Sequence, residues 1–201
     1  MASFVKTFNF TASKVNCLKL EKMALPYFFH RSICQLTEDR QTFKLMSFSS
    51  IQSLLLLVSS DDKDTLERYK WIADMYPHLK KILFIQFTQE KKLDHRVVNG
   101  ILKINKRSFS FFGKPSTDLK NVVRSERFDL LINADERNLL QMHVIAAAAT
   151  SGMKIGSPLG DCKQLYPISL YSQTATTFEE YLTNCHDYLN ALSGDSETKK
   201  G

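Results

Sequence analysis

The chain has 201 residues, 43% of them hydrophobic and 24% charged, which is ordinary for a globular protein with a full hydrophobic core. It contains no apolar run of about 18 residues, which excludes a membrane-spanning helix, and its start lacks the apolar middle of a secretory signal. We therefore expect a cytoplasmic protein.

The net charge of +6 is unevenly placed along the chain. Residues 1–48 carry an excess of basic side chains, namely Lys6, Lys14, Lys19, Lys22, Arg31, Arg40 and Lys44 against Glu21, Glu38 and Asp39. A basic segment of this kind suits an anionic partner such as RNA or an acidic membrane face, and a protein or RNA partner is the expectation for it. A solvated basic helix is the other interpretation, and the arginine-rich, aromatic-interleaved pattern of nucleic-acid modules is missing.

Residues 1–50 predict a partly helical, basic N-terminal extension. Their apolar positions have helical spacing up to Pro26, where proline interrupts the pattern. We expect this extension to pack on the rest of the chain through Tyr27, Phe28 and Phe29.

From residue 51 the pattern becomes regular and alternates between strands and helices. Short apolar runs at 54–58 and 82–87 predict strands that are buried on both faces. The acid-rich start of residues 61–77 predicts a helix between them. Residues 90–106 are ambiguous, and "SFSFF" at 108–112 predicts a third, shorter strand.

The second half continues the alternation. We expect helices at 116–126, at 138–152, where Gly152 ends the apolar run, and at 176–194, where Thr and Gly194 cap an apolar stripe. Strands are expected at 128–135, 153–157 and 166–172. The pattern predicts an α/β domain over 51–194 with a doubly wound, mostly parallel sheet of about five strands, and a disordered tail over 195–201.

Ligands of such sheets bind beyond the carboxyl ends of the strands, near the point where strand order reverses. By position, the segments at 59–64, 113–117 and 133–138 qualify. The candidate ligand-binding residues are Gly113, Lys114, Ser116, Thr117, Asn133 and Asp135.

The segment "GKPST" is not a nucleoside-triphosphate loop. That loop needs a glycine at 108 and a hydroxyl residue after Lys114, and the chain has Ser108 and Pro115 instead. One interpretation is a turn followed by a helix that Ser116 or Thr117 caps. The other is a modest anion site made by the helix start and Lys114.

The remaining polar residues give no catalytic signature. Asp135 suits either a ribose contact or a helix cap, and Asp61, Asp62 and Asp64 suit either a magnesium site or an acidic helix start. His143 lies in the most apolar helix, which favours a packed, neutral imidazole. Since the chain has no G-x-G-x-x-G motif and no metal-ligand spacing of cysteines, we expect no cofactor and no metal.

At "FFGKP" and "RFDLLINADERNLLQMHVIAAAATSGMKIG" the chain resembles a family of uncharacterised bacterial proteins, a domain of unknown function. The resemblance covers about residues 50–192 and rests on Phe112, Gly113, Lys114, Pro115, Phe128, Asp129, Leu130, Ile132, Ala147, Lys154 and Gly156. More loosely, residues 128–156 are similar to a strand-helix-strand unit in the N-terminal half of heptosyltransferases, which implies a shared fold.

Two functions follow as expectations. The first is a non-catalytic interaction or regulatory module with a protein or RNA partner. The alternative is a binder or small enzyme for a phosphorylated or sugar-phosphate ligand. The alternative requires the segments around Lys114, Asp135 and residues 59–62 to converge on one pocket, whereas the interaction module requires an exposed apolar or basic patch.

Overall fold

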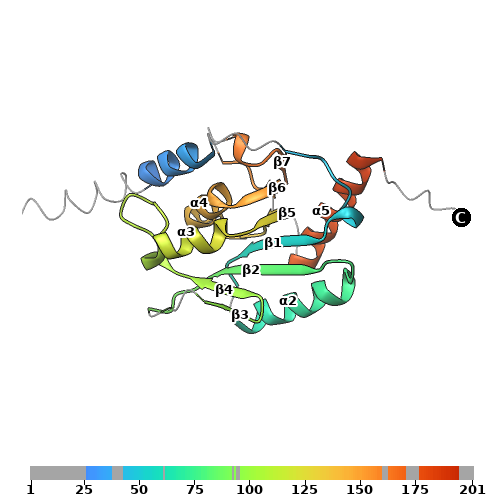
Figure 1. The fold of residues 1–201 in the computed structure, drawn as a ribbon, viewed down its shortest axis with the longest axis horizontal. Helices are drawn as coiled ribbons and strands as arrows, with labels where there is room; N and C mark the ends of the chain where they lie inside the picture. The colour runs from blue at the N-terminus through green and yellow to red at the C-terminus, as the bar shows by residue number, and fades with distance from the viewer. Residues whose placement is uncertain are drawn as a thin grey trace, which may run out of the picture.

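The computed structural model describes residues 26–37, 43–60, 62–91, 93, 96–159, 163–170 and 177–194. Within these residues, seven strands form one sheet that helices cover on both faces (Figure 1). The expected mostly parallel α/β architecture is confirmed, although the sheet has seven strands rather than about five. No helix in this described part is long and apolar enough to cross a membrane.

The strands lie in the order β3-β4-β2-β1-β5-β6-β7. Neighbouring strands are parallel except for β3 and β4, which are antiparallel. The bounds are β1 (Ser53–Val58), β2 (Lys81–Phe87), β3 (Val97–Val98), β4 (Ile101–Ile104), β5 (Arg127–Asn133), β6 (Thr150–Gly156) and β7 (Ile168–Ser169).

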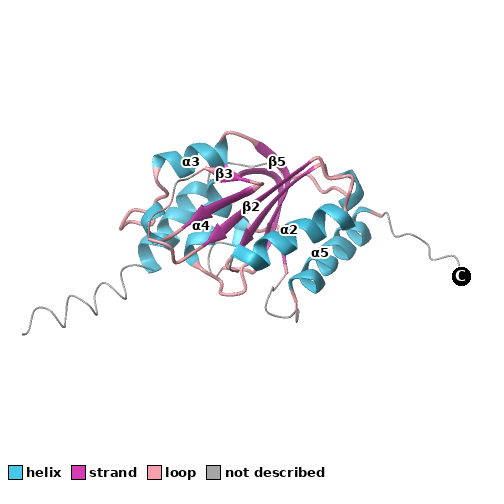
Figure 2. Ribbon diagram, turned by 90° about the horizontal axis from the view of Figure 1, so that it is seen from below, coloured by secondary structure: helices cyan, strands magenta, loops and turns pink. Residues whose placement is uncertain are grey.

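Each face of the sheet has its own hydrophobic core. Helices α3 (Thr117–Arg124) and α4 (Leu140–Ala148) cover one face together with a helix over 26–37, and α2 (Asp62–Met75) and α5 (Phe178–Ser193) cover the other (Figure 2). Short 3-10 turns complete the chain as η1 (Phe48–Ser50), η2 (Lys106–Ser108) and η3 (Lys163–Leu165).

The central strands form because their side chains are apolar on both faces. Leu55 and Leu57 of β1 enter the core under α3 and α4, while Leu54 and Leu56 enter the core under α2 and α5. A continuous leucine run therefore suits a strand with helices on both sides.

Helix α5 begins and ends where its capping residues predict. The Thr177 hydroxyl accepts a hydrogen bond from the Glu180 amide at 3.1 Å, and Gly194 adopts a left-handed φ of 80° after the last turn.

Two expectations about the elements are wrong, and one segment that was left ambiguous contains strands. Residues 108–112 do not form a strand, because only Phe109 pairs, in an isolated bridge with Pro115, and a turn follows. The ambiguous residues 90–106 contain β3 and β4. Gly152 does not end a helix but lies inside β6, since α4 ends at Ala148.

The helix over 26–37 is part of the core on the α3 and α4 face. Phe29 and Ile33 are buried there beside Phe109, as expected for Phe29, whereas Tyr27 is 62% exposed and does not pack inward. Residue 26 is itself helical. The basic residues before it and the tail at 195–201 lie outside the described residues.

Candidate functional site

The point where strand order reverses lies between β1 and β5. From β1 the chain builds the sheet outward through β2 and β4, and then returns to β5 on the other side of β1. The two strand ends are joined there, since the Ala134 amide donates to the Leu57 carbonyl at 3.0 Å. The segments after β1 and β5 therefore meet at one place, as the fold class predicts.

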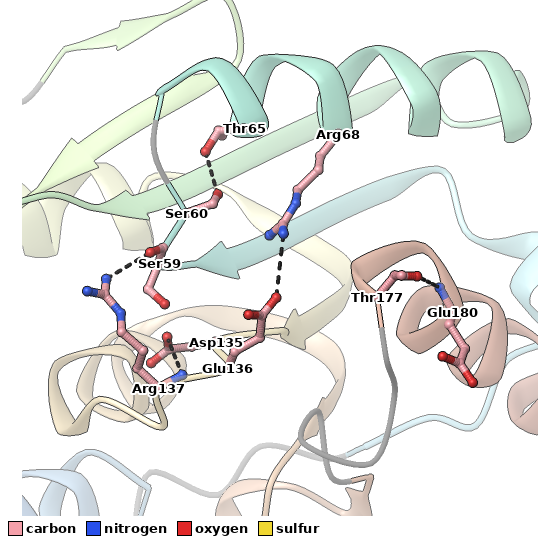
Figure 3. Close-up of polar contacts among 9 residues, drawn as sticks. All are labelled: Ser59, Ser60, Thr65, Arg68, Asp135, Glu136, Arg137, Thr177 and Glu180. Carbon is pink, nitrogen blue, oxygen red and sulfur yellow. Dashed lines mark hydrogen bonds and ion pairs between the residues drawn. The ribbon is translucent and has the colours of Figure 1, made fainter.

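Side chains that follow β5 contact the backbone after β1 and a side chain of α2 (Figure 3). Arg137 donates from Nη2 to the Ser59 carbonyl at 2.8 Å, and Arg68 of α2 lies 3.5 Å from the Glu136 carboxylate. The Ser60 and Thr65 hydroxyls are 2.8 Å apart at the start of α2. The polar groups that follow β1 and β5 are thus linked by hydrogen bonds and an ion pair.

The two polar candidates on β5 and just after it are buried and engaged. The Asp135 carboxylate accepts from the Arg137 amide at 3.2 Å and from the Leu139 amide at 2.6 Å, so it holds the turn that leads into α4. The Asn133 amide donates to the Tyr166 hydroxyl at 2.8 Å and accepts from the Asp135 amide at 3.3 Å. Both side chains therefore form hydrogen bonds that stabilise the fold.

A buried polar chain continues from Asn133 to His143. The Tyr166 hydroxyl lies 2.8 Å from Nδ1 of His143, and Nε2 of His143 lies 2.7 Å from Oδ1 of Asn138. Since the Asn138 oxygen only accepts, Nε2 carries the proton, and Nδ1 then accepts from the Tyr166 hydroxyl. Every member of the chain is satisfied with a neutral imidazole.

The pKa of His143 agrees with this arrangement. Burial lowers it to about 4, with the Asp135 charge raising it and the His30 charge lowering it. The expectation of a packed, neutral histidine is confirmed. Burial also raises the pKa of the Tyr166 hydroxyl, which keeps it protonated as a donor to His143.

The "GKPST" segment forms a turn and a helix cap. The Gly113 amide donates to the Ser110 carbonyl at 2.9 Å, and the Ser110 amide donates to the Lys114 carbonyl at 2.8 Å. The Ser116 hydroxyl accepts from the Leu119 amide at 3.3 Å and so caps α3, while Thr117 is the exposed first residue of that helix. The predicted cap is therefore Ser116.

This segment lies apart from the other two. It follows β4, and β2 and β1 separate β4 from β5 in the sheet, so the strand ends are about 14 Å apart at the usual strand spacing. Lys114 is exposed, and its ammonium makes no hydrogen bond or ion pair within the described residues. The structure thus brings together the segments around Asp135 and Ser60, and it carries Lys114 elsewhere.

The turn lies instead against the helix over 26–37 (Figure 1). The Ser32 hydroxyl donates to the Phe112 carbonyl at 3.0 Å. Gly113 has a φ of 71°, and a Cβ on it would lie 2.9 Å from Cγ of Phe29. Only glycine permits both this backbone conformation and this close approach.

An exposed aromatic cluster results, and we call it the aromatic surface; it consists of Tyr27, Phe28, Phe111 and Phe112. The ring of Phe28 lies 5.1 Å from that of Phe112, 6.0 Å from that of Phe111 and 5.8 Å from that of Tyr27. Exposed fractions are 62% for Tyr27, 52% for Phe111 and 55% for Phe112. Large exposed apolar groups held together in this way mark interaction sites.

Basic residues border the aromatic surface. Arg31 is exposed one helical turn after Tyr27 and Phe28, and Lys114 is exposed immediately after the turn that carries Phe112. Neither residues 26–37 nor residues 105–117 contain an acidic residue. These two segments therefore bring positive charge to the border of the surface, and the exposed Asp118 follows directly after them in the first turn of α3.

Sequence reasoning missed most of the aromatic surface. The sequence predicts a short strand at Phe111 and Phe112 and packing of Tyr27 on the rest of the chain, because aromatic residues have a high strand propensity and a high preference for burial. The glycine after the run was the available signal for a turn. Nothing in the sequence places residues 27 and 112 side by side.

No group of three or more potential metal ligands among His, Cys, Asp and Glu comes together in the described part of the chain. Cys185 lies in the core, and burial raises the pKa of its thiol to about 12, so it is not a nucleophile at neutral pH.

The sequence model of one protein family, described as a family of unknown function (DUF6913), matches residues 26–192. The match confirms the expected domain of unknown function, and it includes the helix over 26–37 that forms half of the aromatic surface. No curated protein and no solved structure matches the chain. The likeness to heptosyltransferases gains no support from these comparisons.

Proposed function

We propose that this chain, which belongs to the family of unknown function DUF6913, is a non-catalytic interaction module that binds a protein partner through the aromatic surface. The observation that carries the proposal is the exposure of Tyr27, Phe111 and Phe112 on one rigidly held cluster. Because each ring is only about half exposed, covering it with a partner contributes about 1 kcal/mol, roughly half of the value for a fully exposed ring, so the rings together supply the centre of an interface.

The surface is already formed without a partner, which supports its role in binding. Phe112 is held through its carbonyl by Ser32, and Gly113 packs on Phe29, which is buried in the core. A partner therefore does not have to order this turn, and less binding energy is lost on association.

The ring geometry favours protein over RNA. The Phe28 and Phe112 rings meet at 90°, and the Phe111 and Phe112 rings at 85°, so ring edges point at ring faces. A base stacks on an open ring face, whereas these faces are partly covered by neighbouring rings. An apolar patch on a protein, bordered by Asp or Glu that pair with Arg31 and Lys114, complements this surface.

The test is a quantitative comparison of affinity in three variants. Partner protein recovered with the wild-type chain is purified, and its Kd is measured for wild type, for Phe111→Ser with Phe112→Ser, and for Tyr188→Ser. Tyr188 is 44% exposed on α5, on the opposite face of the sheet, and serves as the matched control.

We expect the double phenylalanine variant to bind at least about tenfold more weakly, as for residues at the centre of an interface, and Tyr188→Ser to bind like wild type. Equal affinities for all three proteins would place the partner elsewhere and refute the proposal.

A second candidate is a binder of a phosphorylated ligand at the ends of β1 and β5. Its support is the meeting of the segments at 59–60 and 135–137 next to Arg68 and Arg137. A native mass spectrum of protein purified from its own cells tests it. A stoichiometric small adduct that Arg68→Gln abolishes favours this candidate, and a bare chain contradicts it.

A further inference from the structure

The aromatic surface offers a partner ring carbons and very few hydrogen-bonding groups. The three phenylalanine side chains have no donor or acceptor, and the Tyr27 hydroxyl is the one polar group on the four rings. The turn that carries Phe112 uses main-chain groups internally, since the Gly113 amide donates to the Ser110 carbonyl at 2.9 Å. A main-chain N–H of a partner that is pressed on these rings therefore loses its water and finds no acceptor on them.

Two kinds of partner segment avoid this cost. A helix bonds its own main-chain N–H groups, so its apolar side chains can cover the rings. A proline-rich segment in the polyproline II conformation has few N–H groups to lose, because proline has none. The polar side chains at the surface distinguish between these two.

Those polar side chains are hydrogen-bond donors. Tyr27 presents a hydroxyl on a ring that is 62% exposed, and the exposed Arg31 and Lys114 carry only N–H groups. A helix uses its main-chain carbonyls internally, whereas the carbonyls of a polyproline II segment are free to accept. A proline-rich segment therefore offers the Tyr27 hydroxyl a main-chain acceptor, which a helix does not.

The rings also form corners that fit the side chain of proline. Phe28 and Phe112 meet at 90° with their centroids 5.1 Å apart, and Phe111 and Phe112 meet at 85° with their centroids 5.6 Å apart. A pyrrolidine ring is smaller than a nucleobase, so it packs against the face of one ring and the edge of the next. Aromatic-lined surfaces of other domains recognise proline-rich segments in this way.

We propose that the partner segment bound by the aromatic surface is a proline-rich polyproline II stretch flanked by Asp or Glu. This inference rests on the proposed function and names the chemistry of its partner. At least two prolines pack into the corners between the rings, and a main-chain carbonyl accepts from the Tyr27 hydroxyl. The acidic flank pairs with Arg31 and Lys114. Because both the surface and the segment are formed before they meet, little conformational entropy is lost on binding.

A random peptide library tests the inference without the natural partner. Peptides of about 12 residues, which extend over about 37 Å as polyproline II, are displayed on phage and selected on the wild-type chain. Sequences that also bind the variant with Phe111→Ser and Phe112→Ser are discarded. Both rings are about half exposed, so this variant should fold, and circular dichroism checks that it does. The Kd of each enriched peptide is then measured for wild type, Tyr27→Phe and the control Tyr188→Ser.

We expect the enriched sequences to contain at least two prolines with Asp or Glu at one end. Replacing one of these prolines by alanine should weaken binding at least about fivefold, as for a residue at the centre of an interface. Tyr27→Phe keeps the ring and removes the donor, so it should weaken binding by about two- to tenfold. Tyr188→Ser should bind like wild type.

Enriched sequences without proline, with apolar residues at helical spacing, would overturn the inference and leave the proposed function in place. Peptides that bind more tightly after their prolines are replaced by alanine would do the same, since proline disfavours a helix. If no enriched sequence depends on Phe111 and Phe112, the inference also fails. The affinity of the natural partner for the same double variant then decides the proposed function by itself.

Discussion

Gly113→Ala tests whether the turn before α3 is fixed by its contact with the helix over 26–37. A left-handed φ of 71° costs an alanine about 1–2 kcal/mol. The added Cβ would also lie 2.9 Å from Cγ and 3.0 Å from Cα of Phe29, and overpacking of this kind costs about 1–3 kcal/mol. The sum predicts a loss of about 2–5 kcal/mol in the free energy of unfolding.

Gly194→Ala is the matched control. Gly194 has a similar φ of 80°, but a Cβ there meets nothing within 4 Å. It therefore isolates the backbone term, and we expect a loss of about 1–2 kcal/mol. Urea unfolding of both variants, followed by circular dichroism at the same pH, measures the difference. Equal losses in the two variants would show that Phe29 does not clamp the turn, and the rigid surface inferred from it would fail.

Three further outcomes follow from the same structure. Tyr166→Phe leaves the Asn133 amide and Nδ1 of His143 without a partner, so we expect unfolding to become easier by about 2–4 kcal/mol, and a loss under 1 kcal/mol contradicts the buried chain. His143 has a pKa of about 4 in the folded chain against 6.5 in the unfolded chain, so the unfolded chain binds more protons between these pH values. We therefore expect roughly 3 kcal/mol of stability to be lost as the pH falls from about 6.5 to about 4. Urea unfolding at several pH values measures this loss, which should be absent in His143→Gln. Lys114→Ala removes an exposed side chain, so the free energy of unfolding should change by less than about 0.5 kcal/mol, and a loss of several kcal/mol would make Lys114 a structural partner.

The sequence predicts the central strands because burial on both faces leaves a strong pattern. β1, β2 and β5 are short apolar runs, and the structure buries them as expected. The region of β4 is ambiguous in the sequence because the residues of β4 alternate between buried and half-buried, with Lys103 among them, beside Gly100 in a charged region. A strand that is only partly buried has a weaker apolar pattern than a strand buried on both faces.

The candidate site was predictable only in part. The meeting of the segments after β1 and β5 follows from the alternation of strands and helices. The hydrogen bonds from Asn133 to Tyr166 and from the turn before α4 to Asp135 could not be predicted, because tertiary packing determines which groups meet. The aromatic surface could not be predicted for the same reason, since only the tertiary structure brings Phe28 and Phe112 together.

The burial of Lys154 is a further feature that the sequence does not reveal. Its place in an apolar strand was visible in the sequence, where the resemblance to the family also includes it. A lysine is rarely buried, and only the structure shows that this one is.

The most direct test of the interaction module is site-specific photocrosslinking in the cells that make the protein. A photoreactive phenylalanine analogue replaces Phe111 in one variant and Tyr188 in the other, and the covalent products are identified by mass spectrometry. We predict a crosslink from position 111, and not from position 188, to one protein whose contact segment is apolar and flanked by Asp or Glu. A crosslink from position 111 to RNA, or only to residues of the same chain before residue 26, or no product at all, would contradict the central claim.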